Sequence, residues 1–335
     1  MTDDCLIAER FESVLLPEST IYCHPSRISN IYEPFVEEVR QPNAVMAADD
    51  INVRVAKTIV PGYHEIHDGG IKRKLKRLLH TVDRGKADDL GERLVFDARH
   101  SYNDNIAHLI HEHMVLLGYI KARLNYGSDD VIVLLNRDAP ALAVKFFKQI
   151  NYEVFLTDRR VSCNCLDIRI DETRHLLPFL AEIELSGWLA ATPEKVFIPR
   201  KKSRRLKNEE AIFGTLKNLG YERFYFEDIS MMEQWSIMRN AESVVAIHGA
   251  ALGTLGFNVF RSPGKSLSLV ELFSPGLVAN VFRKYMAVLG GDWRGCRGKL
   301  TPDLIRDIDI DKIMKAHAFD DFELAPGVIE RALAA

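Results

Sequence analysis

Basic side chains are concentrated in one short stretch of the chain, residues 200–207, which reads RKKSRRLK. Arginine forks bind phosphate oxygens through paired, charge-assisted hydrogen bonds. Further along come a turn of small residues, His248-Gly249-Ala250, and a carboxylate, Glu271. Backbone N–H groups at a helix start bind a second anion, and a carboxylate at a strand end suits ribose hydroxyls. These residue types favour a site for a phosphorylated, nucleotide-linked ligand.

Alternating strands and helices must position these residues. Apolar runs between helix caps and glycine stops predict strands at 196–198, 223–226, 243–247 and 267–272, and helices at 208–219, 230–240, 250–258 and 278–289. Such alternation predicts right-handed crossovers and a parallel sheet. Ligands of these sheets bind outside the carboxyl ends of the strands, where we expect the basic stretch, the His248 turn and Glu271 to meet.

Each of these features also has a simpler interpretation. A run such as RKKSRRLK is often a solvated loop, and a histidine before a glycine is often a satisfied turn residue. Neither GxGxxG after a strand nor GxxxxGK[ST] occurs in the sequence. The convergence of the three features on one sheet edge favours a functional site.

The first half of the chain has a less regular pattern. We expect strands at 51–60, 94–96, 131–135, 153–156 and 161–170, and helices at 105–124, 141–150 and 172–191, the last interrupted near Pro178. The segment AATPE ends the last helix, so we place a domain boundary there. The expected domains are 1–190, on the acceptor side, and 191–335, which binds the nucleotide.

Composition sets the broad class of protein. The chain has 335 residues, 47% hydrophobic and 27% charged, which is ordinary for a globular protein and long for a single core. The net charge of −3 excludes a polyelectrolyte binder. An odd number of scattered cysteines indicates reduced thiols, although Cys163 and Cys165 share one strand face and leave a metal or redox pair as an alternative.

The cellular setting follows from the N-terminus and the hydropathy pattern. The chain begins with the acidic segment MTDDCLIAERFES, and no stretch approaches the ~18 apolar residues of a membrane span. We therefore expect a cytoplasmic protein. A basic amphipathic helix at 71–79 would allow peripheral contact with the inner membrane, the simpler alternative being a solvated helix face.

Residues 197–293 resemble the C-terminal domain of glycosyltransferase family 61, also described as the DUF563 or capsular-polysaccharide-biosynthesis type. The segments that carry the resemblance are IPRKKSRRLKNEE, EQWSIMRNAESVVAIHGAALGTLGF, SLVELF and FRKYMAVLGGDW. The family's motif positions fall on Arg200, Arg205, Asn208, Glu209, His248, Gly249, Ala250, Leu252, Glu271 and Tyr285. The departures are Pro199, where serine is common, and Ala251, where glycine is usual.

The resemblance implies a particular fold and activity. The fold would be α/β, with two Rossmann-like domains facing a cleft, the GT-B type. The activity would be inverting transfer of a sugar from a nucleotide-sugar donor, commonly a uridine diphosphate sugar, to a glycan or lipid-linked glycan in polysaccharide biosynthesis. The donor-binding residues we expect are Arg200, Arg204, Arg205, Asn208, His248, Gly249, Ala250 and Glu271.

The segment YNDNIAHLIHE resembles the family's N-terminal helix opening. The base that deprotonates the acceptor would then come from the first domain, and His108, Asp104 and Glu112 are the candidates. His108 serving only to orient the acceptor remains open. A metal bound by the histidines of HLIHEH is an alternative, in which His108 and His111 share a helix face and His113 does not.

We expect no metal or other cofactor in the transfer. An Asp-x-Asp string, Asp307-Ile308-Asp309, lies beyond the last expected strand and suits a helix cap better than a metal site. The basic stretch already supplies the positive charge that a metal would bring.

Two other functions remain open at this point. A nucleotide-sugar epimerase of the GT-B shape would share the donor site but need no acceptor. A nucleic-acid-binding module would use RKKSRRLK, although that stretch lacks the interleaved aromatic residues typical of such modules.

Overall fold

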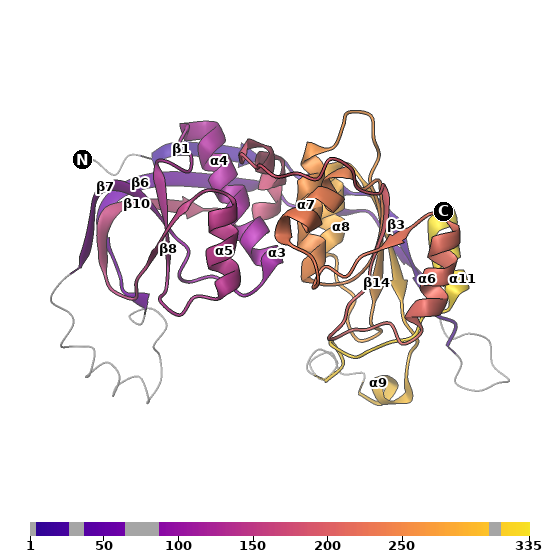
Figure 1. The fold of residues 1–335 in the computed structure, drawn as a ribbon. Helices are drawn as coiled ribbons and strands as arrows, with labels where there is room; N and C mark the ends of the chain where they lie inside the picture. Colours follow the sequence, from indigo (N-terminus) through magenta and orange to yellow (C-terminus); the bar gives the residue numbers. More distant parts are fainter. Residues whose placement is uncertain (1–4, 27–36, 64–86, 308–315) are drawn as a thin grey trace. The chain divides into compact units, whose positions relative to one another are not determined.

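The computed structural model describes residues 5–26, 37–63, 87–307 and 316–335, which form two compact units (Figure 1). Unit 1 comprises Met1–Glu12 and Ala48–Leu185. Unit 2 comprises Ser13–Ala47 and Ser186–Ala335. These units differ in two respects from the expected division into 1–190 and 191–335: the boundary follows Leu185, and an early segment, Ser13–Ala47, belongs with the C-terminal unit.

Unit 1 contains a mixed six-stranded sheet. Its strands, in spatial order, are β1 (Cys5–Phe11), β6 (Asp49–Val60), β10 (Val161–Arg169), β7 (Asp88–Asp97), β8 (Val131–Leu135) and β9 (Glu153–Leu156). The pairs β1–β6 and β6–β10 are antiparallel, and the pairs from β10 to β9 are parallel. Every residue of the apolar strand β8 is buried, as expected for a central parallel strand.

The helices of unit 1 depart from α-helical regularity in two places. The helix expected at 105–124 consists of α3 (Ile106–His108), the π-helix η2 (Leu109–Met114) and α4 (Val115–Leu124). The helix expected at 172–191 is instead a shorter 3-10 helix, η3 (Thr173–Glu182), with Pro178 inside it. Helix α5 (Ala141–Gln149) agrees with expectation.

Unit 2 contains a seven-stranded sheet. Its strands, in spatial order, are β12 (Glu222–Arg223), β11 (Lys195–Ile198), β13 (Ser243–Ile247), β14 (Ser268–Phe273), β15 (Asp292–Arg297), β3 (Ser19–Cys23) and β4 (Glu38–Gln41). All neighbours from β12 to β3 are parallel, and only β4 runs antiparallel. The early segment thus extends the sheet by two strands, and its short strands β2 (Val14–Leu16) and β5 (Ala44–Met46) pair separately.

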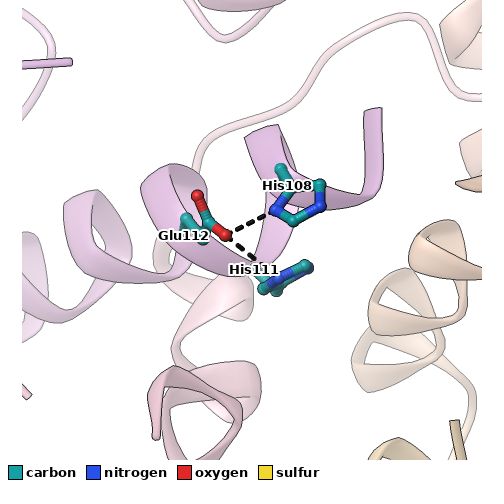
Figure 2. A group of neighbouring side chains, drawn as sticks. All are labelled: His108, His111 and Glu112. Atoms are coloured by element: carbon teal, nitrogen blue, oxygen red, sulfur yellow. Dashed lines mark hydrogen bonds and ion pairs between the residues drawn. The ribbon is translucent and has the colours of Figure 1, made fainter. Parts of the chain in front are cut away.

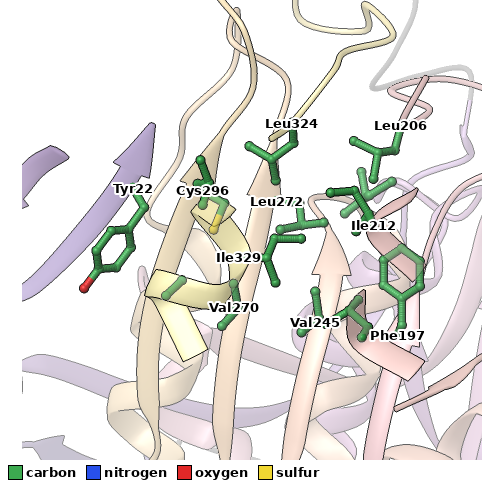
Figure 3. Packing of buried hydrophobic residues seen from close by; sticks show 14 of the residues in the cluster. Tyr22, Phe197, Leu206, Ile212, Val245, Val270, Leu272, Cys296, Leu324 and Ile329 are labelled. Atoms are coloured by element: carbon green, nitrogen blue, oxygen red, sulfur yellow. The ribbon is translucent and has the colours of Figure 1, made fainter. Parts of the chain in front are cut away.

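Helices cover both faces of the unit 2 sheet (Figure 1). On one face, α6 (Glu209–Asn218) and α11 (Pro326–Ala334) pack on buried strand residues that include Phe197, Val245 and Leu272 (Figure 3). The other face carries α7 (Met231–Asn240), α8 (Val281–Leu289) and η4 (Ala250–Phe260), which is a 3-10 helix rather than the expected α-helix. Short helix α9 (Pro302–Arg306) follows β15. The mixed α/β class expected from the sequence is confirmed.

Strand alternation decides which side chains of β14 can reach a site. Val270 and Leu272 belong to the cluster under α6 and α11. Side chains alternate between the faces of a strand, so Glu271 points to the opposite face. Glu271 was expected at the carboxyl end of its strand, open to a ligand, but it lies inside β14 with none of its side chain exposed.

Candidate functional site

Two arginines in the loop after β11 contact the turn that follows β13. Nη1 of Arg200 and Nη1 of Arg204 both donate to the backbone oxygen of His248, at 3.1 and 2.9 Å. Arg204 is buried, with 9% of its surface exposed, and Arg200 is partly buried. The loop therefore places two cations together at the carboxyl edge of the parallel sheet, where open α/β sheets bind ligands.

The described residues offer the charges of Arg200 and Arg204 no ion pair. Within the described residues, no carboxylate lies within salt-bridge distance of Arg200 or Arg204. Burial lowers the pKa of Arg200 and outweighs the nearby negative charge of Glu227, which raises it. Burial together with the charge of Arg200 lowers the pKa of Arg204 to about 10. Two adjacent, desolvated guanidinium groups are strongly stabilised by an anion with several oxygens.

The backbone of Arg204 is also unusual, because its φ of 56° lies in the left-handed region. That region costs a non-glycine residue on the order of 1 kcal/mol, and residues held there cluster at ligand-binding sites. The backbone N–H of Arg204 donates to the oxygen of Phe319 at 3.1 Å, which stabilises the strained conformation.

Gly249 permits the approach of Arg200 to the His248 turn. A Cβ atom at this position would lie 1.7 Å from Nη1 of Arg200, so any side chain would displace the guanidinium. The glycine expected at the turn is thus required by a close arginine contact. Ala250 follows it as the first residue of η4.

Two other residues expected to bind the donor are engaged in contacts within unit 2. Nε and Nη2 of Arg205 donate to Oδ2 of Asp321, at 2.9 and 2.6 Å. Nδ2 of Asn208 donates to the backbone oxygen of Leu324 at 2.7 Å, and its Oδ1 accepts from the Leu324 N–H at 3.2 Å. Arg205 still lines a cavity of about 620 Å³ together with Arg200, Tyr225 and Lys207.

A buried carboxylate fixes the orientation of the His248 ring. Nδ1 of His248 lies 2.5 Å from Oε1 of Glu271, and Oε2 of Glu271 accepts from Nε1 of Trp293 at 2.7 Å. The ring also stacks on Phe273, with the ring centroids 5.4 Å apart. Both carboxylate oxygens are therefore occupied by side chains of unit 2. Trp293 was not singled out from the sequence as a site residue, although it lies within the motif FRKYMAVLGGDW.

In unit 1, His108, His111 and Glu112 form a compact group at the start of the π-helix (Figure 2). Nδ1 of His108 lies 2.5 Å from Oε1 of Glu112, and Nε2 of His111 lies 3.6 Å from the same oxygen. Burial raises the pKa of Glu112, but hydrogen bonds from His111 and His108 outweigh it and lower that pKa to about 2. Glu112 is an anion at neutral pH and orients both rings.

The same three side chains could hold a metal ion, because their candidate ligand atoms all lie within 4.8 Å of one another. Imidazole nitrogens and a carboxylate are a ligand set that suits zinc. π-helical turns are rare and frequently mark functional sites. The group is therefore suited to proton transfer or to metal binding.

Two other polar residues of this segment differ in their exposure to solvent. Asp104 is exposed, two residues before the start of α3. His113 is buried, Nε2 lies 3.2 Å from Oδ1 of Asn103, and burial lowers its pKa to about 4. His113 is thus a neutral core residue, in line with the expectation that it points away from His108.

Several expectations concern segments outside the described residues. The basic segment 71–79 lies there, as do residues 308–311 of the Asp-x-Asp string. Asp307 is described, and its Oδ2 lies 3.3 Å from Nε2 of His317. None of the described helices has the length and apolar character needed to cross a bilayer.

Comparison with known protein families shows which family the chain belongs to. The family model for glycosyltransferase 61 matches residues 15–264. The chain belongs to this family. The chain is accordingly a glycosyltransferase and acts on a sugar donor and an acceptor. The match runs through both units and includes His108, the arginine loop and the His248 turn, whereas Glu271 and Trp293 lie beyond its end. No curated protein matches the chain.

Proposed function

We propose that this glycosyltransferase transfers a sugar, with inversion, from a uridine diphosphate sugar to a glycan or lipid-linked glycan in polysaccharide biosynthesis. Unit 2 would be the donor domain and unit 1 the acceptor domain of a GT-B-type enzyme. The observation that carries this proposal is the pair Arg200 and Arg204, two desolvated cations without a carboxylate ion pair in the described part of the chain. A diphosphate leaving group supplies the anion that such a pair lacks.

The chemistry divides between three groups. Arg200 and Arg204 neutralise the charge that develops on the diphosphate as the bond to the anomeric carbon breaks. His248, whose Nδ1 is held by Glu271, offers its other ring nitrogen, Nε2, as an acceptor for a hydroxyl group of the same donor. The oxygen of the acceptor hydroxyl attacks the anomeric carbon from the face opposite the diphosphate, and His108 accepts the hydroxyl proton. Glu112 stabilises the imidazolium that forms.

We also propose that the transfer needs no divalent metal. In metal-dependent sugar transferases the cation neutralises the diphosphate, and here the arginine pair provides that charge. The group of His108, His111 and Glu112 belongs to unit 1, and the arginine pair belongs to unit 2. In this mechanism His108 accepts a proton, Glu112 stabilises the imidazolium, and neither ligates a metal.

A direct test incubates the purified chain with uridine diphosphate sugars and a panel of glycan acceptors. Acceptor-dependent release of uridine diphosphate, with a new glycoside of inverted configuration, is the expected result. Retention of configuration, or a strict preference for another nucleotide, would contradict the corresponding part of the proposal. An enzyme acting as an epimerase would instead isomerise the donor sugar without any acceptor.

A further inference from the structure

A second cavity of unit 2, of about 820 Å³, lies at the carboxyl ends of three parallel strands. Ser203 follows β11, Pro275 follows β14 and Lys299 follows β15, and all three residues line the cavity. The volume falls in the range of small-molecule sites. Its position is the one at which parallel α/β sheets bind nucleotides.

The cavity wall carries an exposed aromatic ring next to the arginine pair. Phe319 lines the cavity and is 62% exposed. The guanidinium carbon of Arg204 lies 4.8 Å from the centre of the Phe319 ring. One face of the ring is thus covered by Arg204, and the exposed surface of the residue leaves the opposite face for a planar ligand.

The charges of the lining suit the uncharged part of a nucleotide better than a phosphate. Apolar surface comes from Phe319, Phe322, Pro275, Leu300 and Leu304. Three lysines of the wall are matched by four carboxylates, at positions Lys202, Lys207, Lys299, Asp303, Asp320, Asp321 and Glu323. Such a balanced wall does not concentrate anions, in contrast to the adjacent arginine pair.

We propose that this cavity holds the nucleoside of the sugar donor, with its base stacked on the Phe319 face opposite Arg204. Arg204 then lies between the Phe319 ring and the diphosphate, and its guanidinium contacts both. The inference rests on the proposed function, since it assigns the nucleoside of the same donor. Base–aromatic stacking tolerates any base, so Phe319 provides affinity, and the polar side chains of the wall select the nucleotide.

The test compares ligands that share the diphosphate but differ in the nucleoside. Calorimetric titrations of the full chain use uridine, cytidine, guanosine and adenosine diphosphates and, in parallel, inorganic pyrophosphate. Phe319→Ala should weaken the tightest nucleoside diphosphate about tenfold or more and leave pyrophosphate affinity within about twofold. Phe319→Trp keeps an aromatic face and should retain nucleotide affinity.

Leu219→Ala is the matched control, because Leu219 is an exposed apolar residue of the same unit, at the end of α6. It should leave both affinities unchanged, and thermal unfolding of every variant checks the fold. Equal losses for nucleotide and pyrophosphate in Phe319→Ala would overturn the stacking, because Phe319 would then only support Arg204. Unchanged nucleotide affinity in Phe319→Ala would also overturn the stacking, but it would not contradict the diphosphate site at Arg200 and Arg204. Failure of the wild-type chain to bind any of the five ligands would overturn both proposals.

Discussion

Nδ1 of His248 lies 2.5 Å from Oε1 of the fully buried Glu271. The second carboxylate oxygen accepts from the indole N–H of Trp293. An ionised carboxylate in this position requires a proton on Nδ1, which fixes the ring tautomer and leaves Nε2 for a ligand. Glu271 thus acts on the site through His248, since none of its side chain is exposed to a ribose hydroxyl.

Substitution of Glu271 tests whether it positions His248 or binds ribose. Glu271→Gln keeps an acceptor for only one of the two donors, so we expect a loss of about 1–3 kcal/mol in unfolding free energy together with slower turnover. Glu271→Leu leaves both donors unpaired and should cost more. Urea unfolding and initial rates measure the two effects. Wild-type stability combined with lost uridine affinity would instead support the ribose role.

The parallel sheet of unit 2 could be predicted from the sequence because its central strands are short apolar runs. The runs that became β13 and β14 lie between helices with capping residues and glycine stops, so each piece of local evidence agreed with the tertiary structure. The turn at Gly249 could be predicted for the same reason, although its contact with Arg200 could not.

The other features of the fold and of the site could not be predicted, mostly because they depend on contacts between segments far apart in the sequence. Strand β3 pairs with β15, and neither its five residues nor their local pattern identifies a partner almost the whole chain away. The backbone N–H of Arg204 donates to the backbone oxygen of Phe319 and so holds that residue near the arginine pair, a non-local contact that periodicity does not encode. The π-helix at His111 has no residue signature that separates it from an α-helix.

Removal of the His108 side chain should affect turnover and leave donor binding unchanged. His108→Ala is expected to lower the rate at saturating donor by about 10²–10⁴-fold, the usual contribution of a general base. Donor affinity, measured by calorimetry, should stay within twofold. A variant that loses donor affinity and keeps its rate at saturation would reverse the roles assigned to the two units. His111→Ala is the control, because it removes the neighbouring ring of the same group and leaves His108 in place.

Chelation tests the proposal that transfer needs no metal. Excess EDTA should leave the rate unchanged, because the arginine pair supplies the charge on the diphosphate. Metal analysis of the purified chain and of His111→Ala shows whether the unit 1 group holds an ion. Loss of activity in EDTA, with recovery on addition of Mn²⁺, Mg²⁺ or Zn²⁺, would refute metal independence.

Acidification should destabilise the chain through His113. Its pKa of about 4 in the folded protein is below the unfolded value of 6.5, because burial disfavours the charged ring. The unfolded chain therefore binds a proton that the folded chain does not between pH 6.5 and 4, and stability falls as the pH drops through that range. The unfolding free energy lost over this pH range amounts to about 3 kcal/mol.

Urea unfolding of the wild-type chain and of His113→Gln at pH 7 and pH 4.5 measures this effect. Glutamine does not titrate, so the variant should lose less stability between the two pH values than the wild-type chain. Equal losses in both proteins would show that His113 does not titrate as an isolated buried ring.

The most direct measurement of the central proposal is calorimetric titration of uridine diphosphate into the wild-type chain and into three single arginine variants. Arg200→Ala and Arg204→Ala each remove one guanidinium from a pair that has no ion pair among the described residues, and should weaken binding by about 2 kcal/mol, roughly thirtyfold. Arg205→Ala should cost less, because Arg205 is already paired with Asp321. Unchanged affinity in Arg200→Ala and Arg204→Ala would contradict the assignment of this pair to the donor diphosphate.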